Sequence, residues 1–271
     1  MGQYLLCQKM AQMPYEIEEM GLHIYSVEEL CYYIYHNLPM IDDSFISETL
    51  IEFIREELGM PTLAERCHRY FQSSADLDTT LVMLLRSVGY YTEEEITEFQ
   101  EFMIQLHRKN PMERAKERAD LLFFHGKYQN AIKAYGVIVS QSRDFRVKSG
   151  FYAEVLQHMA VCCLRLHLYP EALDCLKASY GENKDIRVLQ QIYDFCVLTR
   201  QALPKELFQD IEDATLINWQ KDYCEAQDAS MQEIERGKSV SIFALEGEER
   251  EVALENYLRR EKDLYRKMTA E

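Results

Sequence analysis

Two segments in the middle of the chain align with each other at a constant offset of 41 residues. The matching positions hold alanines or bulky hydrophobic residues in the same order. They are Ala119, Leu122, Tyr128, Ala131, Ile132 and Tyr135 in the first segment, and Ala160, Cys163, Tyr169, Ala172, Leu173 and Leu176 in the second. Alanines twelve positions apart suit two antiparallel helices that cross closely, because a small side chain lets the backbones approach. Since single helix–loop–helix units cannot bury their faces alone, the repeat predicts hairpins that stack into a solenoid.

The beginning of the second helix in each hairpin resembles the tetratricopeptide repeat. The resemblance rests on the segments Gly126–Ile132 and Leu168–Leu173. It implies right-handed stacked hairpins whose first helices line a groove for a peptide. The chain departs from the family in three ways: the offset exceeds the roughly 34 residues of that repeat, the first helices lack its usual tryptophan, and His167 stands where Gly126 stands one unit earlier. A third unit from about Arg187 is degenerate, because Glu206 takes the place of the alanine.

Helical signals also dominate the first hundred residues. We expect helices at about 26–36, 44–58, 62–71, 78–88 and 92–108. Ser26, Thr62 and Thr92 are each followed by a glutamate three residues later, which is the spacing of a capping box. Strand patterns are confined to short stretches at 4–7 and 22–25. The pair Asn110–Pro111 marks a boundary, because the residue before a proline is disfavoured in a helix.

The sequence therefore predicts an all-α protein in three parts. These are an acidic helical N-terminal domain at 1–109, tetratricopeptide-like repeats at 110–202 and a C-terminal helical extension at 203–271. In the extension, we expect one helix from Pro204 to Tyr223, a break at 237–247 and a charged helix at 248–268. We expect the apolar stripe of this last helix to pack on the protein's own body rather than in a coiled coil.

The net charge of −16 is unevenly distributed. Residues 1–110 carry 19 acids and 7 bases (−12), residues 111–200 carry 10 acids and 13 bases (+3), and the remainder carries 17 acids and 10 bases (−7). A negative field repels phosphate backbones, which argues against a nucleic-acid partner. We also expect no membrane association, since no charge-free stretch approaches the roughly 20 residues of a membrane helix. Eight scattered cysteines in a chain of this length favour reduced thiols and a cytoplasmic location.

The residues that could carry chemistry cluster between 158 and 167. His158 with Cys162, and Cys163 with His167, are spaced four apart and could each chelate a metal. The two pairs point about 100° apart on a helix and no acid lies between them, so we favour a structural role. We expect no catalytic residues, no cofactor and no metal. A metal-dependent enzyme built on His158, Cys162 and His167 is the less favoured alternative.

The favoured function is a protein- or peptide-binding adaptor. By analogy with the repeat family alone, the groove candidates are Lys116, Asp120, Phe123, Gln157, Val161, Leu164 and Arg165. The residues that exceed the usual repeat length fit a basic loop, whose cations are Arg143, Arg146 and Lys148. Plain solvation of this loop is the favoured interpretation, and the alternatives are that it binds an acidic peptide or the chain's own acidic domain. Asp120, where the family's carboxylate clamp has an asparagine, disfavours that clamp. A peptide-sensing transcriptional regulator is the alternative from another class, although the acidic N-terminal part lacks a basic recognition helix.

Overall fold

The computed structural model describes residues 7, 9–73, 76–236, 242 and 245–269. Helices make up most of these residues, and the strands among them form a single two-stranded sheet, so the all-α class is confirmed. The chain divides into two compact units, one built from residues 1–125 and 143–147, the other from 126–142 and 148–270. Within the described residues, no helix combines sufficient length with sufficient hydropathy to cross a bilayer.

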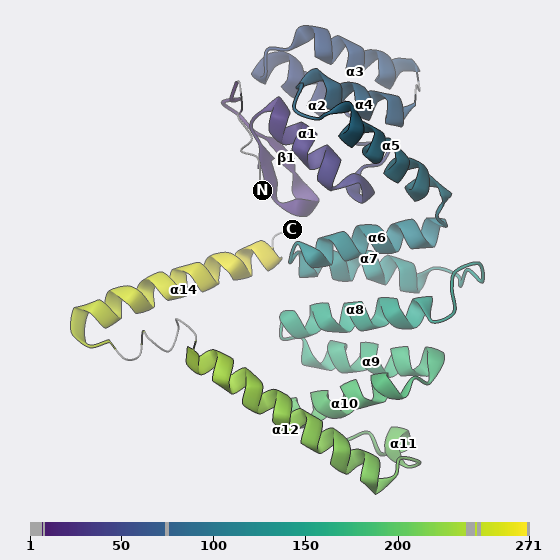
Figure 1. Cartoon of the computed structure of the whole chain (residues 1–271), viewed down its shortest axis with the longest axis vertical. Helices are drawn as coiled ribbons and strands as arrows, with labels where there is room; N and C mark the ends of the chain where they lie inside the picture. The colour runs from purple at the N-terminus through teal and green to yellow at the C-terminus, as the bar shows by residue number, and fades with distance from the viewer. Residues whose placement is uncertain (1–6, 8, 74–75, 237–241, 243–244, 270–271) are drawn as a thin grey trace. The chain divides into compact units, whose positions relative to one another are not determined.

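The first unit begins with a short antiparallel hairpin followed by helices. Strands β1 (Tyr15–Ile17) and β2 (Leu22–Ile24) flank the 3-10 turn η1 (Glu18–Met20), with Glu16 opposite His23. The elements that follow are α1 (Val27–His36), η2 (Leu38–Met40), α2 (Glu48–Glu52), the π-helical turn η3 (Phe53–Glu57), α3 (Pro61–Ser73), α4 (Leu77–Ser87) and α5 (Glu93–Arg108) (Figure 1). The expectation at 22–25 thus corresponds to β2, whereas 4–7 lies outside the described residues except for Cys7.

The helix ends of the first unit follow the local signals in the sequence. Thr92 forms a complete capping box with Glu95, and Ser26 accepts a hydrogen bond from the amide of Glu29. Thr62 was expected to cap a helix, but α3 already begins at Pro61, so Thr62 lies inside its first turn. Gly59 adopts a left-handed conformation (φ 63°) directly after η3, as expected of a residue that stops a helix.

The core of the first unit lies between α1, α2 and η3, α4 and α5. Its side chains are at most 2% exposed and include Leu30, Ile34, Leu50, Ile54, Leu81, Leu84, Leu85 and Ile96. Leu30 and Ile34, Leu50 and Ile54, and Leu81 with Leu84 and Leu85 are spaced three or four residues apart, which is the pattern of one buried helical face. This periodicity is why the sequence alone located these helices to within a few residues.

Helix α6 (Pro111–Phe124) belongs to the first unit by its contacts. Its Arg118 donates to the carbonyl oxygen of Met40 (3.0 Å) and to the carboxylate of Glu19 (2.6 Å), and lies 3.5 Å from that of Asp42. The boundary expected at 109/110 coincides with the break between α5 and α6, where Asn110 caps α6. The three-part division made from the sequence stays a prediction, since the compact units separate after His125 instead.

The second unit is a series of helices joined by short connections. They are α7 (Tyr128–Ser140), α8 (Phe151–Arg165), α9 (Tyr169–Asn183), α10 (Ile186–Thr199), α11 (Lys205–Phe208), α12 (Asp213–Arg236) and α14 (Gly247–Thr269). Helices α8 and α9 form a hairpin, and α7 and α10 pack against its two sides (Figure 1). The alanines of the sequence repeat, Ala119, Ala131, Ala160 and Ala172, are all 0% exposed. This burial supports the alignment, while tetratricopeptide geometry stays a prediction.

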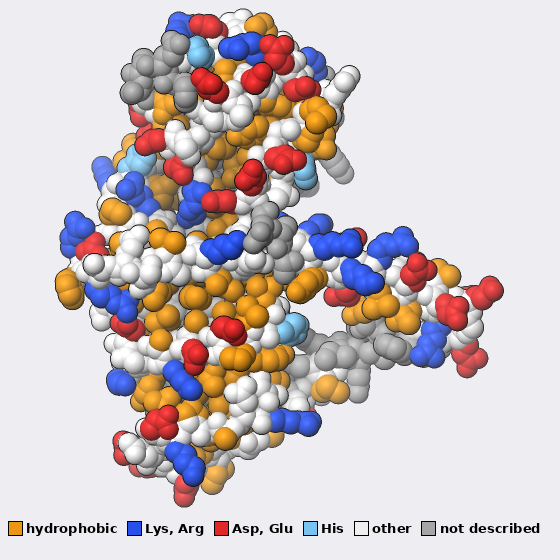
Figure 2. Space-filling model, turned by 180° about the vertical axis from the view of Figure 1, so that it is seen from behind, with side chains coloured by type: hydrophobic (Ala, Val, Ile, Leu, Met, Phe, Trp, Pro, Cys, Tyr) orange, Lys and Arg blue, Asp and Glu red, His pale blue; other side chains and the backbone are white. Residues whose placement is uncertain are grey.

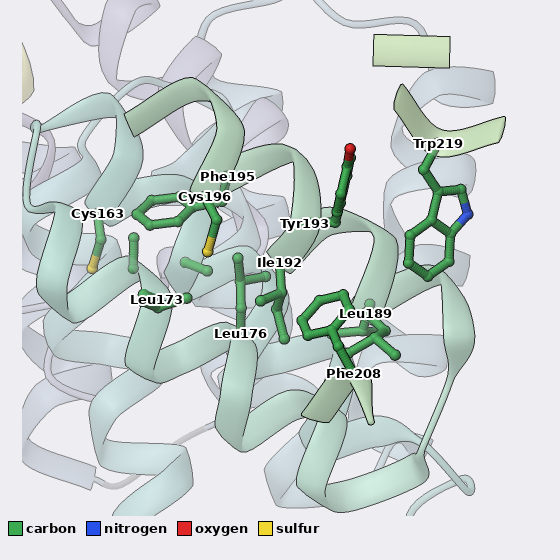
Figure 3. Close-up of a cluster of buried hydrophobic side chains, with 13 residues drawn as sticks. Cys163, Leu173, Leu176, Leu189, Ile192, Tyr193, Phe195, Cys196, Phe208 and Trp219 are labelled. Atoms are coloured by element: carbon green, nitrogen blue, oxygen red, sulfur yellow. The ribbon is translucent and has the colours of Figure 1, made fainter. Parts of the chain in front are cut away.

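One hydrophobic cluster joins α8 through α12. Figure 3 shows Cys163 of α8 and Leu173 and Leu176 of α9 beside the apolar face of α10. At the far end of the cluster, Trp219 of α12 lies 5.8 Å from the Tyr193 ring and 6.4 Å from the Phe208 ring. The aromatic contacts hold α11 and α12 on α10, because burying large rings removes extensive apolar surface from water.

The C-terminal extension differs from expectation at its start. A single helix was predicted from Pro204 to Tyr223, but α11 ends at Phe208 and α12 begins only at Asp213. The interruption lets Phe208 and Trp219 approach one core from two directions, which a continuous helix could not do. The break predicted at 237–247 falls largely on residues outside the described part, and α14 matches the charged helix expected at 248–268.

Candidate functional site

The groove candidates lie on two helices, as the sequence predicts, but these helices belong to different units. Lys116, Asp120 and Phe123 are on α6, and Gln157, Val161, Leu164 and Arg165 are on α8. The structure thus brings the candidates on α6 close to one another, and likewise the candidates on α8. It does not place the two groups relative to each other, so a joint groove stays a prediction.

On α6, the candidates are already engaged with one another. The ammonium of Lys116 lies 2.7 Å from the carboxylate of Asp120 one turn later, and both side chains are mostly buried. Phe123 is half-buried and its ring packs edge-on against Phe124 at 5.7 Å. Phe124 is 79% exposed, because it points away from the face that carries Ala119 and Leu122. The exposed aromatic group of α6 is therefore Phe124.

Helix α8 is packed around most of its circumference. Phe151, Val155, Ala160, Cys162 and Cys163 are each at most 2% exposed. A narrow strip remains open: Val161 is 37% exposed, and Arg165 follows one turn later on the same face and is also exposed. Leu164 beside it is half-buried and packs against the cluster of Figure 3. In the view of Figure 2, hydrophobic side chains gather over the stacked helices of the second unit.

Gln157 lies one turn before Val161 on the same side of α8, where its side chain is engaged with α9. Its side-chain amide donates to the hydroxyl of Ser179 on α9 at 3.3 Å, and that hydroxyl donates to the carbonyl oxygen of Ala153 at 2.9 Å. Ser179 is 0% exposed, so these bonds satisfy a buried polar group at the crossing of α8 and α9. The position of Gln157 serves the hairpin, and the remaining surface of α8 is defined by Val161 and Arg165.

The basic loop between α7 and α8 is internally paired. Arg146 donates from Nε (2.9 Å) and Nη2 (2.7 Å) to the two carboxylate oxygens of Asp144, and Lys148 lies 2.8 Å from Glu154. Asp144 also accepts from the side chain of Asn110 at 2.9 Å. The hydrogen bonds from Arg146 and Asn110 hold the pKa of Asp144 well below its ordinary value. Fewer cations of this loop are thus available to an acidic peptide than the sequence suggests.

The exposed aromatic residue of this loop was missed by sequence reasoning. Phe145 lies between Asp144 and Arg146 and is 96% exposed. The backbone amide of Arg146 donates to Asp144 at 3.0 Å, which forms a tight turn around the phenylalanine. A large hydrophobic residue within a polar loop is the signal that could have identified it.

Each histidine of the 158–167 region lies against a tyrosine hydroxyl. Nδ1 of His158 lies 3.3 Å from the hydroxyl of Tyr135, and Nδ1 of His167 lies 3.0 Å from that of Tyr169. Cys162 and Cys163 are buried. In the part of the chain that the structure describes, no three His, Cys, Asp or Glu side chains are grouped to hold a metal.

A thiol pair on α8 and α9 also escaped the sequence analysis. The thiol of Cys163 donates a hydrogen bond to the sulfur of Cys175, which lowers the pKa of Cys175. The same hydrogen bond, together with burial, raises the pKa of Cys163. Cys175 is half-buried whereas Cys163 is buried, so Cys175 is the more accessible thiol of the pair.

A cavity of about 570 Å³ lies in the first unit between α3, α4 and α5. Its wall includes Asp78 and Arg86, which are bound to groups at its rim: Asp78 lies 3.3 Å from His107, and Arg86 lies 2.8 Å from Glu93. Burial raises the pKa of Asp78, and the neighbouring His107 opposes that rise. The cavity could admit a small polar molecule, but its charges already compensate one another.

Comparisons with known proteins give no match: no family model, no curated protein and no solved structure is similar to this chain.

Proposed function

We propose that this protein is a non-catalytic adaptor that binds a protein or peptide along the open strip of α8. The observation that carries the proposal is the contrast on this helix: one side of it is fully packed, whereas Val161 and Arg165 stay exposed next to each other on the opposite side. An apolar side chain next to a cation favours a partner segment that combines hydrophobic and acidic residues. The proposal includes action in the cytoplasm, which rests on the number and spacing of the cysteines in the sequence.

The uneven charge along the chain supports an adaptor. The residues before Pro111 carry the bulk of the negative charge, while the helices that carry the strip are close to neutral. An acidic partner is therefore repelled less strongly at α8 than elsewhere. In the repeat family that the hairpins resemble, peptides bind along first helices, and α8 is the first helix of its hairpin.

Arg165→Glu tests the proposal. The side chain is exposed, so we expect the free energy of unfolding to stay within about 0.5 kcal/mol of the wild-type value. Affinity capture from the native host, followed by identification of co-purifying proteins, should show a partner retained by wild type and lost by the variant. Lys205→Glu on α11 is the matched control, since it makes the same charge change at another exposed site. Equal capture by all three proteins would show that the strip is not the binding surface.

A further inference from the structure

Helix α14 carries an apolar stripe along one face, which Glu261 interrupts at its centre. At 100° per residue, the following residues fall within a sector of about 120°: Leu254, Tyr257, Leu258, Leu264, Tyr265 and Met268. The polar sides of the helix are held by ion pairs within the helix, Glu255 with Arg259 at 3.3 Å and Asp263 with Arg266 at 3.1 Å. The stripe is thus the surface that α14 has available for another hydrophobic element.

The protein's own body covers the ends of the stripe better than its middle. Helix α14 contacts α7. Lys267 in its last turn is near Lys127, whose pKa is lowered first by burial and then by this second ammonium. Leu254 and Met268 are half-buried. Between them, Tyr257 is 37%, Leu258 47%, Leu264 42% and Tyr265 54% exposed, and Figure 2 shows hydrophobic side chains on the surface of this helix. The expectation that the stripe packs on the body therefore holds for its ends only.

The order of residues in the stripe is symmetric about Glu261. Leu258 and Leu264 lie three positions on either side of it, Tyr257 and Tyr265 four positions, and Leu254 and Met268 seven positions. When two identical helices pair antiparallel about a twofold axis at Glu261, each residue lies at the same height as the residue of the other copy that is equally far on the other side of Glu261. Leucine is then level with leucine, tyrosine with tyrosine, and leucine with methionine. A stripe with this symmetry is complementary to itself, which is the requirement of an isologous dimer.

We propose that α14 pairs with α14 of a second copy of this chain, antiparallel and centred on Glu261. The charges around the axis fit this partner. Arg260 and Lys262 flank Glu261 about 100° to either side, so the cations of one copy border the carboxylate of the other. Binding of a different protein would not require the stripe to be symmetric. Pairing with a second copy does require it, and the sequence has this symmetric order of residues about Glu261.

The dimer is expected to be weak. The exposed middle of the stripe, from Tyr257 to Tyr265, is only about 12 Å long at 1.5 Å per residue, so it buries less than the roughly 800 Å² per partner of a standard interface. Two carboxylates at the centre oppose pairing further, because they must leave water together. Sedimentation equilibrium of the full chain should therefore show a concentration-dependent dimer with a Kd on the order of 10 μM to 1 mM.

Two single substitutions on α14 test which face pairs. Leu264→Glu places a charge in the stripe and should raise the Kd at least about tenfold. Val252→Glu is the matched control: Val252 is 60% exposed and lies about 180° from Glu261 around the helix, so the Kd should not change. Glu261→Leu removes the central carboxylates and should lower the Kd by about tenfold or more. Circular dichroism and the fluorescence of Trp219 verify that each variant is folded.

A pair of double variants tests the orientation. In Tyr257→Lys/Tyr265→Glu, antiparallel pairing sets the introduced lysine level with the introduced glutamate of the other copy, so dimers should persist. In Tyr257→Lys/Tyr265→Lys, cations meet cations and dimers should be lost. Loss in both variants would indicate parallel pairing and overturn the proposed geometry. A wild-type chain that stays monomeric up to about 1 mM, or equal loss in Leu264→Glu and Val252→Glu, would overturn the proposal itself. None of these outcomes depends on the binding strip of α8.

Discussion

A residue with left-handed backbone conformation follows the first helix of each aligned hairpin. At such a position glycine should make the protein more stable than alanine does, the opposite of its effect inside a helix. Gly126 has φ 71°, and His167, its counterpart 41 residues later, has φ 60°. A Cβ atom added at Gly126 would meet no atom within 4 Å, so Gly126→Ala changes backbone energy without steric conflict. The left-handed conformation costs an L-residue about 1–2 kcal/mol, and alanine recovers about 0.4–1 kcal/mol by restricting the unfolded chain. We expect a net loss of about 1 kcal/mol.

The reciprocal change at the second hairpin should stabilise the protein. His167→Gly removes the same strain, and it also removes the 3.0 Å hydrogen bond between Nδ1 of His167 and the hydroxyl of Tyr169. That bond is exposed and offsets part of the gain, so we expect about 0.5 kcal/mol of additional stability. Gly136→Ala in α7 is the control, because Gly136 lies in a helix interior with open space around its Cα. It should gain up to about 1 kcal/mol from helix propensity.

Urea unfolding followed by tryptophan fluorescence measures these differences in the free energy of unfolding for the second unit. Trp219 is the only tryptophan of the chain and is 7% exposed in the core of the second unit. Midpoints are compared at equal m-values, so that each shift reports stability. If Gly126→Ala matched the wild type, or changed stability in the same direction as Gly136→Ala, the reasoning from the left-handed turn would be refuted.

Three further predictions concern packing, the basic loop and the thiols. Ala172→Leu forces a large side chain into a fully buried crossing and should lower the free energy of unfolding by about 1–3 kcal/mol, whereas Ala178→Leu on the exposed side of α9 should be neutral in the same urea assay. Asp144→Asn should speed trypsin cleavage after Arg146 at pH 7, because the carboxylate that holds this arginine is lost. Since the pKa of Asp144 is lowered in the folded protein, its carboxylate contributes to stability above its ordinary pKa of about 3.9, and this contribution is lost as the pH falls from there through the lowered folded pKa. Unfolding without reductant should expose eight titratable thiols, and a thiol assay that finds two fewer would contradict the free state of the cysteines.

At the candidate surface, the sequence predicted on which helix the residues lie but not how their side chains are oriented. The alignment placed Val161 and Arg165 correctly on a first helix, because helical periodicity and the repeat offset are properties of the chain order. It could not show that Gln157 turns to Ser179 on α9, or that Phe145 projects fully into solvent. These orientations depend on which neighbouring side chains satisfy a polar group, and the neighbours come from other helices.

The sequence by itself determined most of the helices and several of their ends. The capping box of Thr92, the left-handed Gly59 and the buried alanines of the repeat all follow from interactions within about four residues or from residue size. Only the tertiary structure decided that α6 joins the first unit, because Arg118 binds groups 76 to 99 residues earlier in the chain. Contacts over such separations are selected by the packing of the whole unit, and no local pattern in the sequence specifies them.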